Sequence, residues 1–218
     1  MTAKERIDPV GKYGVAATRD FLLAAYRSHP TFARLYDLAD TDTDRTAGIL
    51  MEICRQAQRA GTLLACRRGN ETLGALAWLP NRSPEPPLRA FLRTPLLHTA
   101  WWVRHCWNAA RNRRTLGTAA YARWRAYVGM ARRAPVHVPT LLICALAVAP
   151  SARRTGVARR LLAEVAANPI WSHWAHALEV NTWDAENVLI YERLGFTVAD
   201  HARAGDVDCW TMLRPIRP

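Results

Sequence analysis

Residues 141–162 constrain the possible fold most, because an apolar run of strand length is followed closely by an amphipathic helical pattern. The run Leu141–Val148 is apolar throughout and has the length of a strand, which is typical of a strand covered on both faces. Pro150 ends this run, and apolar residues recur at helical spacing from Val157 onward. We therefore expect a buried strand, a tight loop and a helix in direct succession.

The loop before this helix has the composition of an anion-binding site. The first N–H groups of a helix have no partner inside the helix, and they bind phosphate well. Arginines add positive charge around this point: Arg153, Arg154, Arg159 and Arg160. The chain contains neither G-x-x-x-x-G-K-[ST] nor G-x-G-x-x-G, so the common nucleotide loops are unsupported. The pattern predicts a diphosphate site of another kind, with an ordinary turn bearing solvated arginines as the alternative.

A second pattern follows downstream. The segment Ala177–Val180 predicts a short buried strand, and Asn187–Phe196 predicts a helix that is closed by Gly195. Asn187 and Tyr191 lie one helical turn apart, so they share a face.

Together these motifs resemble the GNAT acetyltransferase superfamily. Arg153-x-x-Gly156-x-Ala158 is similar to its acetyl-CoA pyrophosphate loop, and the order strand, asparagine, tyrosine and Gly-Phe recurs in it. The resemblance implies an α/β fold with a mixed, mostly antiparallel central sheet, a splayed cofactor-binding strand pair and helices on both faces. The cofactor is then acetyl-CoA, and the implied binding residues are Leu146, Ala147, Val148, Arg153, Arg154, Thr155, Gly156, Val157, Ala158, Asn187 and Tyr191.

The C-terminal part resembles the puromycin N-acetyltransferase-like enzymes more closely. The similarity includes Tyr191–Val198 and Cys209–Met212, whereas Arg153 and Ala158 replace the glutamine and glycine of that group. It implies direct transfer of an acetyl group to a primary amine of a small molecule, an antibiotic or specialised metabolite. Acetylation of a protein or peptide amine stays open as an alternative.

The resemblance also assigns catalytic roles. Tyr191 is the implied general acid for the departing thiolate, with a packed core tyrosine as the alternative. The general base is open between Glu179 and His137, and we rank Glu179 first. Backbone N–H groups of Leu146 and Val148 are implied to contact the pantetheine arm and the thioester. Cys144 lies in the same strand, where we expect a buried thiol rather than an acyl-enzyme nucleophile.

Composition sets further bounds. We expect one domain over residues 1–218, and the net charge of +12 is nearly all arginine. Arginines and aromatic residues gather in a stretch, about 84–136, that we interpret as an insert of two amphipathic helices, Leu96–Arg113 and Thr118–Arg133. This insert is expected to border the acceptor site; a non-catalytic module that binds nucleic acid or another protein is the alternative.

The remaining expectations concern partners and location. The five cysteines are scattered and show no metal-ligand spacing, so we expect reduced thiols and no metal site. The sequence shows no signal-peptide pattern and no membrane-spanning run, which favours a cytoplasmic protein. We expect a small-molecule amine as partner and a monomer or homodimer. The other predicted elements are a loose start Met1–Gly14 with a poorly defined first strand before Val15, helices Val15–His29, Thr43–Ala60, Gly156–Ala167 and Ala185–Arg193, a hairpin of Thr62–Arg67 with Thr72–Trp78, and a loop Pro80–Pro87.

Overall fold

The computed structural model describes residues 5–26, 43–59, 61–81, 133–169, 175–204 and 207–216, with a few positions between 114 and 131. These residues form one seven-stranded sheet in the order β1-β2-β3-β4-β5-β7-β6. Its strands are β1 Glu5–Pro9, β2 Leu63–Arg68, β3 Glu71–Asn81, β4 Thr140–Val148, β5 Ala177–Thr182, β6 Thr197–Ala204 and β7 Val207–Pro215. Neighbouring strands are antiparallel except β4 and β5, which are parallel. The predicted mixed, mostly antiparallel sheet is confirmed.

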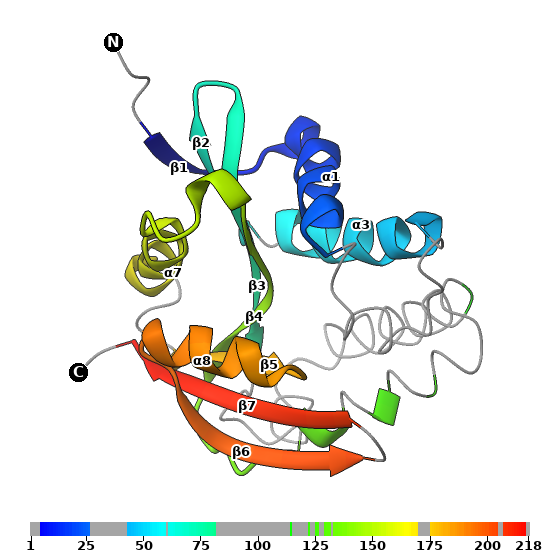
Figure 1. Ribbon diagram of the computed structural model, residues 1–218, viewed down its shortest axis with the longest axis vertical. Coiled ribbons are helices and arrows are strands. Elements are labelled where there is room, and N and C mark those ends of the chain that lie inside the picture. Colours follow the sequence, from blue (N-terminus) through cyan, green and yellow to red (C-terminus); the bar gives the residue numbers. More distant parts are fainter. Residues whose placement is uncertain are drawn as a thin grey trace, which may run out of the picture.

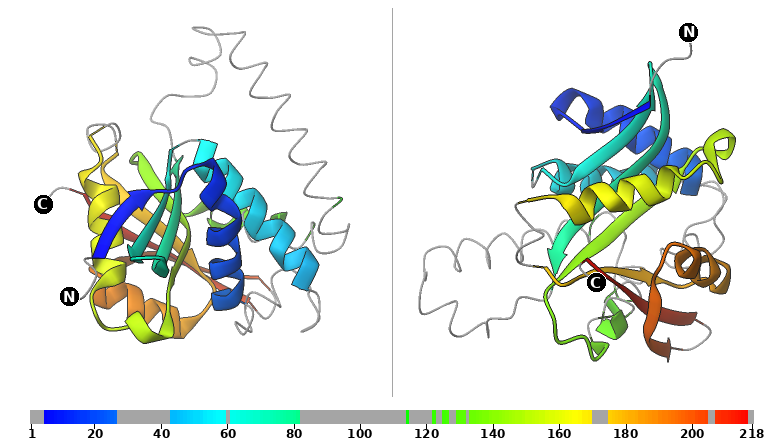
Figure 2. Two further views of the ribbon diagram at one scale, coloured as in Figure 1. Left: turned by 90° about the horizontal axis from the view of Figure 1, so that it is seen from above. Right: turned by 90° about the vertical axis from the view of Figure 1, so that its left-hand side faces the viewer.

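Helices cover both faces of this sheet (Figures 1 and 2). The helices α1 (Val15–Tyr26) and α3 (Thr43–Arg59) pack on one face, over a core that includes Leu22, Leu50 and Cys54. The helices α7 (Val157–Ala167) and α8 (Ala185–Arg193) lie on the other face, over a core that includes Leu161 and Phe196. The central strands are therefore covered on both sides, as the apolar run in β4 predicts.

The strand β4 changes its facing at Cys144. The register between β3 and β4 shifts by one residue there, so Cys144 is the extra residue of a β-bulge. Before the bulge, Leu141 and Ile143 belong to the core beneath α7; after it, Ala145 and Ala147 belong to the core beneath α1 and α3. Strict alternation would have placed all four on one face. The bulge thus gives the two ends of β4 different surroundings.

Several predicted boundaries need correction. The poorly defined first strand expected before Val15 is β1, in which Ile7 and its neighbours pair with β2. The strand β3 runs through Pro80 to Asn81, so these two residues are not part of the predicted loop. Pro80 fits there because it is the penultimate residue of the strand, where its missing N–H costs little. The predicted helix Leu96–Arg113 and most of Thr118–Arg133 lie outside the described residues.

Two smaller expectations can be compared with the described residues. Cys54, Cys66, Cys144 and Cys209 are free thiols, while Cys106 lies outside this part of the chain. None of the described helices is both long enough and apolar enough to cross a membrane.

Candidate active site

The parallel strands β4 and β5 separate halfway along β4. They pair only from Thr140 to Ile143, opposite Ala177 to Val180, and β4 then continues to Val148 paired with β3 alone. Backbone groups alternate in direction along a strand, and Ala149 donates its N–H to Leu73 of β3. Leu146 and Val148 therefore direct their backbone groups away from β3, toward the space that β5 has left.

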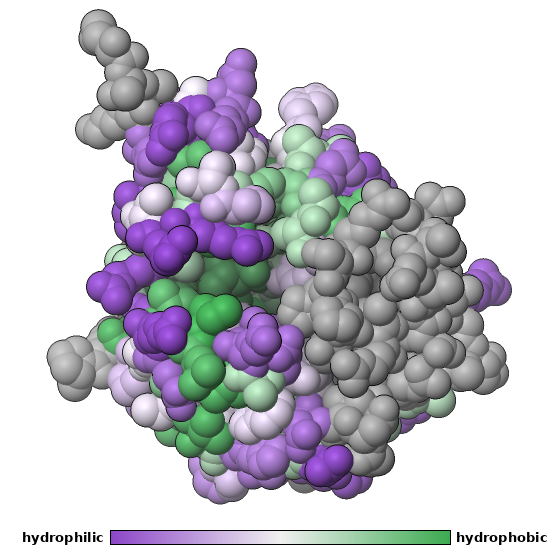
Figure 3. Space-filling model, viewed as in Figure 1, coloured by the Kyte–Doolittle hydropathy of each residue, from purple (hydrophilic) through white to green (hydrophobic). Residues whose placement is uncertain are grey.

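The molecular surface is hollowed beside this free edge (Figure 3). Apolar side chains line the hollow between the end of β4 and α8. Leu146 and Val148 from β4, with Val188 and Tyr191 from α8, are partly buried and pack against the same core. Ala147, by contrast, faces β3 with its backbone and is buried beneath α1 and α3. Of the three β4 residues predicted to bind the cofactor, Leu146 and Val148 thus lie on the free edge.

The helix α7 begins next to the end of β4, with its first turn open to solvent. Gly156 is its N-cap residue, at φ +86°, and no side chain caps it among the described residues. A Cβ atom at Gly156 would meet no atom within 4 Å, so the space before the helix is open. Arg154 also has positive φ, 64°, and on either side of it the N–H groups of Arg153 and Thr155 donate to carbonyls within the loop. Arg153, Arg154 and Arg159 are exposed around this point.

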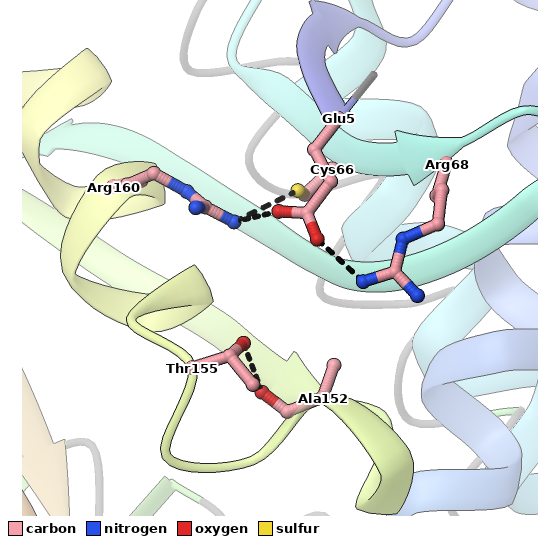
Figure 4. Close-up of polar contacts among 6 residues, drawn as sticks. All are labelled: Glu5, Cys66, Arg68, Ala152, Thr155 and Arg160. Carbon is pink, nitrogen blue, oxygen red and sulfur yellow. Dashed lines mark hydrogen bonds and ion pairs between the residues drawn. The ribbon is translucent and has the colours of Figure 1, made fainter. Parts of the chain in front are cut away.

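Contacts on either side hold this loop in place (Figure 4). The Thr155 hydroxyl donates to the Ala152 carbonyl at 2.8 Å, which closes the loop. Arg160, in the first turns of α7, forms an ion pair with Glu5 of β1, and Glu5 also accepts from Arg68 of β2 at 2.6 Å. The Arg68 guanidinium, and then Arg160, lower the pKa of Glu5 below its usual value despite partial desolvation. These contacts fasten the start of α7 to the edge of the sheet, while the predicted loop residues Val157 and Ala158 pack inward.

The C-terminus of α8 holds Tyr191 in place. Phe196 donates its N–H to the Tyr191 carbonyl at 3.0 Å, and Gly195 donates to Glu192 at 2.9 Å. With Gly195 at φ +88°, these two bonds form a Schellman motif, as the sequence predicts. The Tyr191 ring packs edge-on against Phe196, at 5.5 Å between centroids. Asn187 lies one turn earlier on α8 and is partly buried.

Tyr26, the last residue of α1, reaches the free edge of β4 from the other face. Its hydroxyl oxygen lies 3.1 Å from the Leu146 nitrogen and 3.2 Å from the Leu146 oxygen. Burial, and secondly the nearby Tyr26, raise the pKa of Tyr191 above its usual 10.0, which places the two phenols within electrostatic range. Sequence reasoning missed Tyr26. The one available signal is its spacing, four residues after the buried Leu22 on α1.

Glu179 lies on β5 beside the point where the strands diverge. Its carboxylate is fully buried and accepts hydrogen bonds from Thr140 at 2.6 Å and from Asn81 at 3.1 Å. Burial, and secondly Glu179, raise the pKa of Cys144 to about 12. The Cys144 thiol therefore stays protonated at neutral pH, and it lies close enough to Glu179 to sense its charge. A protonated thiol is a poor nucleophile.

His137 does not lie near the point where β4 and β5 diverge. It is exposed and precedes β4 by three residues, at the end of the strand away from Leu146. Six residues of strand separate Thr140 from Leu146, which corresponds to about 20 Å. Glu179 pairs opposite Leu142, nearer to the point where the strands diverge, although its carboxylate bonds Thr140. Of the two candidate bases, Glu179 is the buried one and His137 the exposed one.

The hydrogen-bonding and charged groups at this site fit an acyl-CoA. Open N–H groups at the start of α7, with exposed arginines around them, suit a diphosphate. The free edge of β4 offers alternating N–H and C=O groups to an extended amide-containing arm. Tyr191 of α8 packs against the same core as Leu146 and Val148. The arrangement accommodates each chemical part of acetyl-CoA from the diphosphate to the thioester.

Comparisons with known proteins agree with this assignment. Residues 102–198 match the family model of an acetyltransferase (GNAT) domain. No curated protein matches the sequence. Among solved structures, the chain is similar to a histone acetyltransferase HPA2 and related acetyltransferase from Corynebacterium glutamicum, with 19% identity, a TM-score of 0.62, and 100% of this chain and 99% of that chain covered.

Two further structures have the same fold. One is Drosophila melanogaster polyamine N-acetyltransferase, which forms N-acetylagmatine (16% identity, TM-score 0.57, 96% of this chain and 98% of that chain). The other is yncA of Salmonella typhimurium, seen with its cofactor acetyl-CoA (14% identity, TM-score 0.51, 98% and 94%). The fold is that of the GNAT acetyltransferases. The match to an acetyltransferase (GNAT) domain over residues 102–198 agrees with this shared fold.

Proposed function

We propose that this protein is an acyltransferase that moves the acetyl group of acetyl-CoA directly to a primary amine of a small molecule. The observation that carries the proposal is the free β4 edge at Leu146, with the Tyr191 phenol in electrostatic range of Tyr26, which contacts Leu146. The buried Glu179 carboxylate lies further back along β4, beside Thr140. Acyl transfer needs an oxyanion donor, an acid for the thiolate and a base for the amine. These three groups provide one of each.

Each residue then has a defined role. The Leu146 N–H stabilises negative charge on the acyl oxygen, and the Val148 edge and α7 loop hold the rest of the donor. Glu179 accepts the amine proton, through water, as the new C–N bond forms. Tyr191 gives its proton to the sulfur as the C–S bond breaks, and its raised pKa keeps that proton available at neutral pH. Asn187 orients the donor or a bound water.

Direct transfer is favoured over an acyl-enzyme on Cys144. A nucleophilic cysteine reacts as its thiolate, and burial raises the pKa of Cys144 to about 12. Its sulfur also points back to the Leu142 carbonyl, at 3.6 Å. The thiol is thus both protonated and turned toward its own strand.

The acceptor is proposed to be an amine of the antibiotic or specialised-metabolite class. Support comes from the resemblance of Tyr191–Val198 and Cys209–Met212 to the puromycin N-acetyltransferase-like enzymes. The similarity to an enzyme that forms N-acetylagmatine supports a small amine more generally. We expect the reaction to occur in the cytoplasm, where free thiols such as those of Cys54 and Cys66 are kept reduced.

The proposal is tested with the purified chain, acetyl-CoA and a panel of acceptors. The panel holds puromycin, agmatine, an arylalkylamine and a peptide with a free N-terminus, each beside its hydroxyl or N-blocked analogue. Thiol release should require a free small amine, and mass spectrometry should find the N-acetyl product. Acetylation of the peptide alone would transfer the activity to protein amines. Thiol release with no acceptor, together with an acetylated Cys144 that Cys144→Ala abolishes, would overturn direct transfer.

A further inference from the structure

The Tyr26 hydroxyl occupies part of the free edge of β4. It lies within hydrogen-bond distance of both backbone groups of Leu146, at 3.1 Å from the nitrogen and 3.2 Å from the oxygen. Tyr26 therefore takes the place that a β5 residue would have filled had the two strands stayed paired. Its helix, α1, lies on the opposite face from α7 and α8 (Figure 2).

The same N–H of Leu146 is the donor that the proposed reaction requires. An amide N–H carries one hydrogen, and a good hydrogen bond directs it at one acceptor. An acyl oxygen that accepts this hydrogen would lie about 2.9 Å from the nitrogen, which is where the Tyr26 oxygen now lies. The two oxygens therefore compete for a single position.

We propose that the Tyr26 hydroxyl is an internal stand-in for the acyl oxygen, and that it sets how strongly the protein prefers acetyl-CoA to free CoA. This inference rests on the proposed function. Free CoA ends in a thiol and has no carbonyl, so Tyr26 stays on Leu146 when CoA binds. Acetyl-CoA displaces the hydroxyl and loses part of its binding free energy in doing so.

The position of Tyr26 suits this exchange. Its side chain is only partly buried. Burial raises the pKa of Tyr26 above its usual 10.0, so the hydroxyl keeps its proton at neutral pH. Once the acetyl group has left, the hydroxyl can return and satisfy both groups of Leu146.

The test is the ratio of two affinities. Isothermal titration calorimetry measures Kd for acetyl-CoA and for CoA in the wild-type protein, in Tyr26→Phe and in Tyr13→Phe. Tyr13 is 96% exposed, so its variant is the matched control for loss of a phenol hydroxyl. We expect Tyr26→Phe to tighten acetyl-CoA binding by about three- to tenfold, the range of one net hydrogen bond, and to leave CoA binding unchanged. An unchanged ratio in a folded Tyr26→Phe protein would overturn the inference.

A second measurement needs no variant. Crystal structures of the wild-type protein with acetyl-CoA and with CoA should differ at Tyr26, whose hydroxyl leaves Leu146 only in the acetyl-CoA complex. The hydroxyl remaining on Leu146 in both complexes would refute the stand-in role. Failure of the wild-type protein to bind acetyl-CoA at all would instead count against the proposed function, so the two failures are distinguishable.

Discussion

Tyr191 and Phe196 are joined twice, by the Phe196 N–H donating to the Tyr191 carbonyl at 3.0 Å and by edge-on packing of their rings at 5.5 Å. Both contacts belong to the turn that ends α8. The aromatic pair is the apolar contact that commonly accompanies a Schellman motif. The end of the helix therefore also positions the proposed acid, and local backbone geometry becomes part of the catalytic arrangement.

A substitution at Gly195 should affect both stability and activity. Gly195 has φ +88°, and a Cβ there would only touch the Arg214 side chain at 3.6 Å, so the backbone conformation sets the cost. We expect Gly195→Ala to lower the free energy of unfolding by about 1–2 kcal/mol and to reduce kcat by up to about a hundredfold. Chemical denaturation and steady-state kinetics measure the two effects.

Gly61→Ala is the control for this prediction. Gly61 also has positive φ, +69°, with no atom within 4 Å of its Cβ position, and it precedes β2 rather than following α8. The Gly61→Ala variant should lose a similar free energy of unfolding and keep the wild-type kcat. If both variants lost activity equally, the position of Tyr191 would not be the cause.

Removing the Tyr191 hydroxyl should reduce turnover. A positioned general acid contributes about a hundredfold or more, so Tyr191→Phe should lower kcat by that amount with little change in the Kd for acetyl-CoA. Burial raises the pKa of Tyr191 above 10.0, and the acid works while it is protonated. The wild-type kcat should therefore show no alkaline decline from this group below pH 10. A decline below pH 10 that Tyr191→Phe removes would contradict the assigned pKa direction, and full turnover in the variant would end the acid role.

Glu179→Gln tests the proposed base. The substitution keeps an oxygen that can accept from Thr140 and Asn81 but removes the basic carboxylate. We expect kcat to fall by about a hundredfold or more while the thermal midpoint moves little. Glu192→Gln is the control, because Glu192 is exposed on α8. A large loss in His137→Ala beside a fully active Glu179→Gln would instead assign the base to His137.

Much of the fold was predictable because its signals are short in range. Apolar periodicity indicates β4, α7 and β5, and the glycine after α8 indicates its C-cap. The hairpin β2–β3 follows from its turn residues, with Gly69 at φ +58°. These features depend on residues a few positions apart, which a single sequence displays directly.

The site was less predictable because it depends on distant partners. Tyr26 and Leu146 are 120 positions apart, and no motif marks their contact. The bulge at Cys144 leaves no trace in an apolar run, since both faces of that strand are covered and both demand apolar residues. The short strand β1 is polar and gains its structure only by pairing with β2.

The packing of α7 on β3 gives a further prediction, at Gly74. A Cβ on Gly74 would lie 2.6 Å from a methyl carbon of Val157 and 3.2 Å from the Ala147 carbonyl oxygen, so α7 must move outward. We expect Gly74→Ala to cost about 1–3 kcal/mol of stability and to weaken acetyl-CoA binding, because the first turn of α7 shifts.

A double-mutant cycle separates this clash from other effects. Adding Val157→Ala removes the closest contact, so the two changes together should cost less than their sum. Gly11→Ala, which would meet no atom within 4 Å, serves as the control. Strict additivity of Gly74→Ala and Val157→Ala would show that a clash with Val157 is not the cause of the lost stability.

Hydrogen exchange tests the central claim most directly, since it reports which backbone N–H groups the donor covers. Acetyl-CoA at saturating concentration should slow exchange at Val148 on the free edge of β4 and at Val157, Ala158 and Arg159 in the first turn of α7. Amides of the β6–β7 pair should exchange as before. If neither Val148 nor the α7 turn is slowed, acetyl-CoA does not bind between the diverging strands, and the account of the site is wrong.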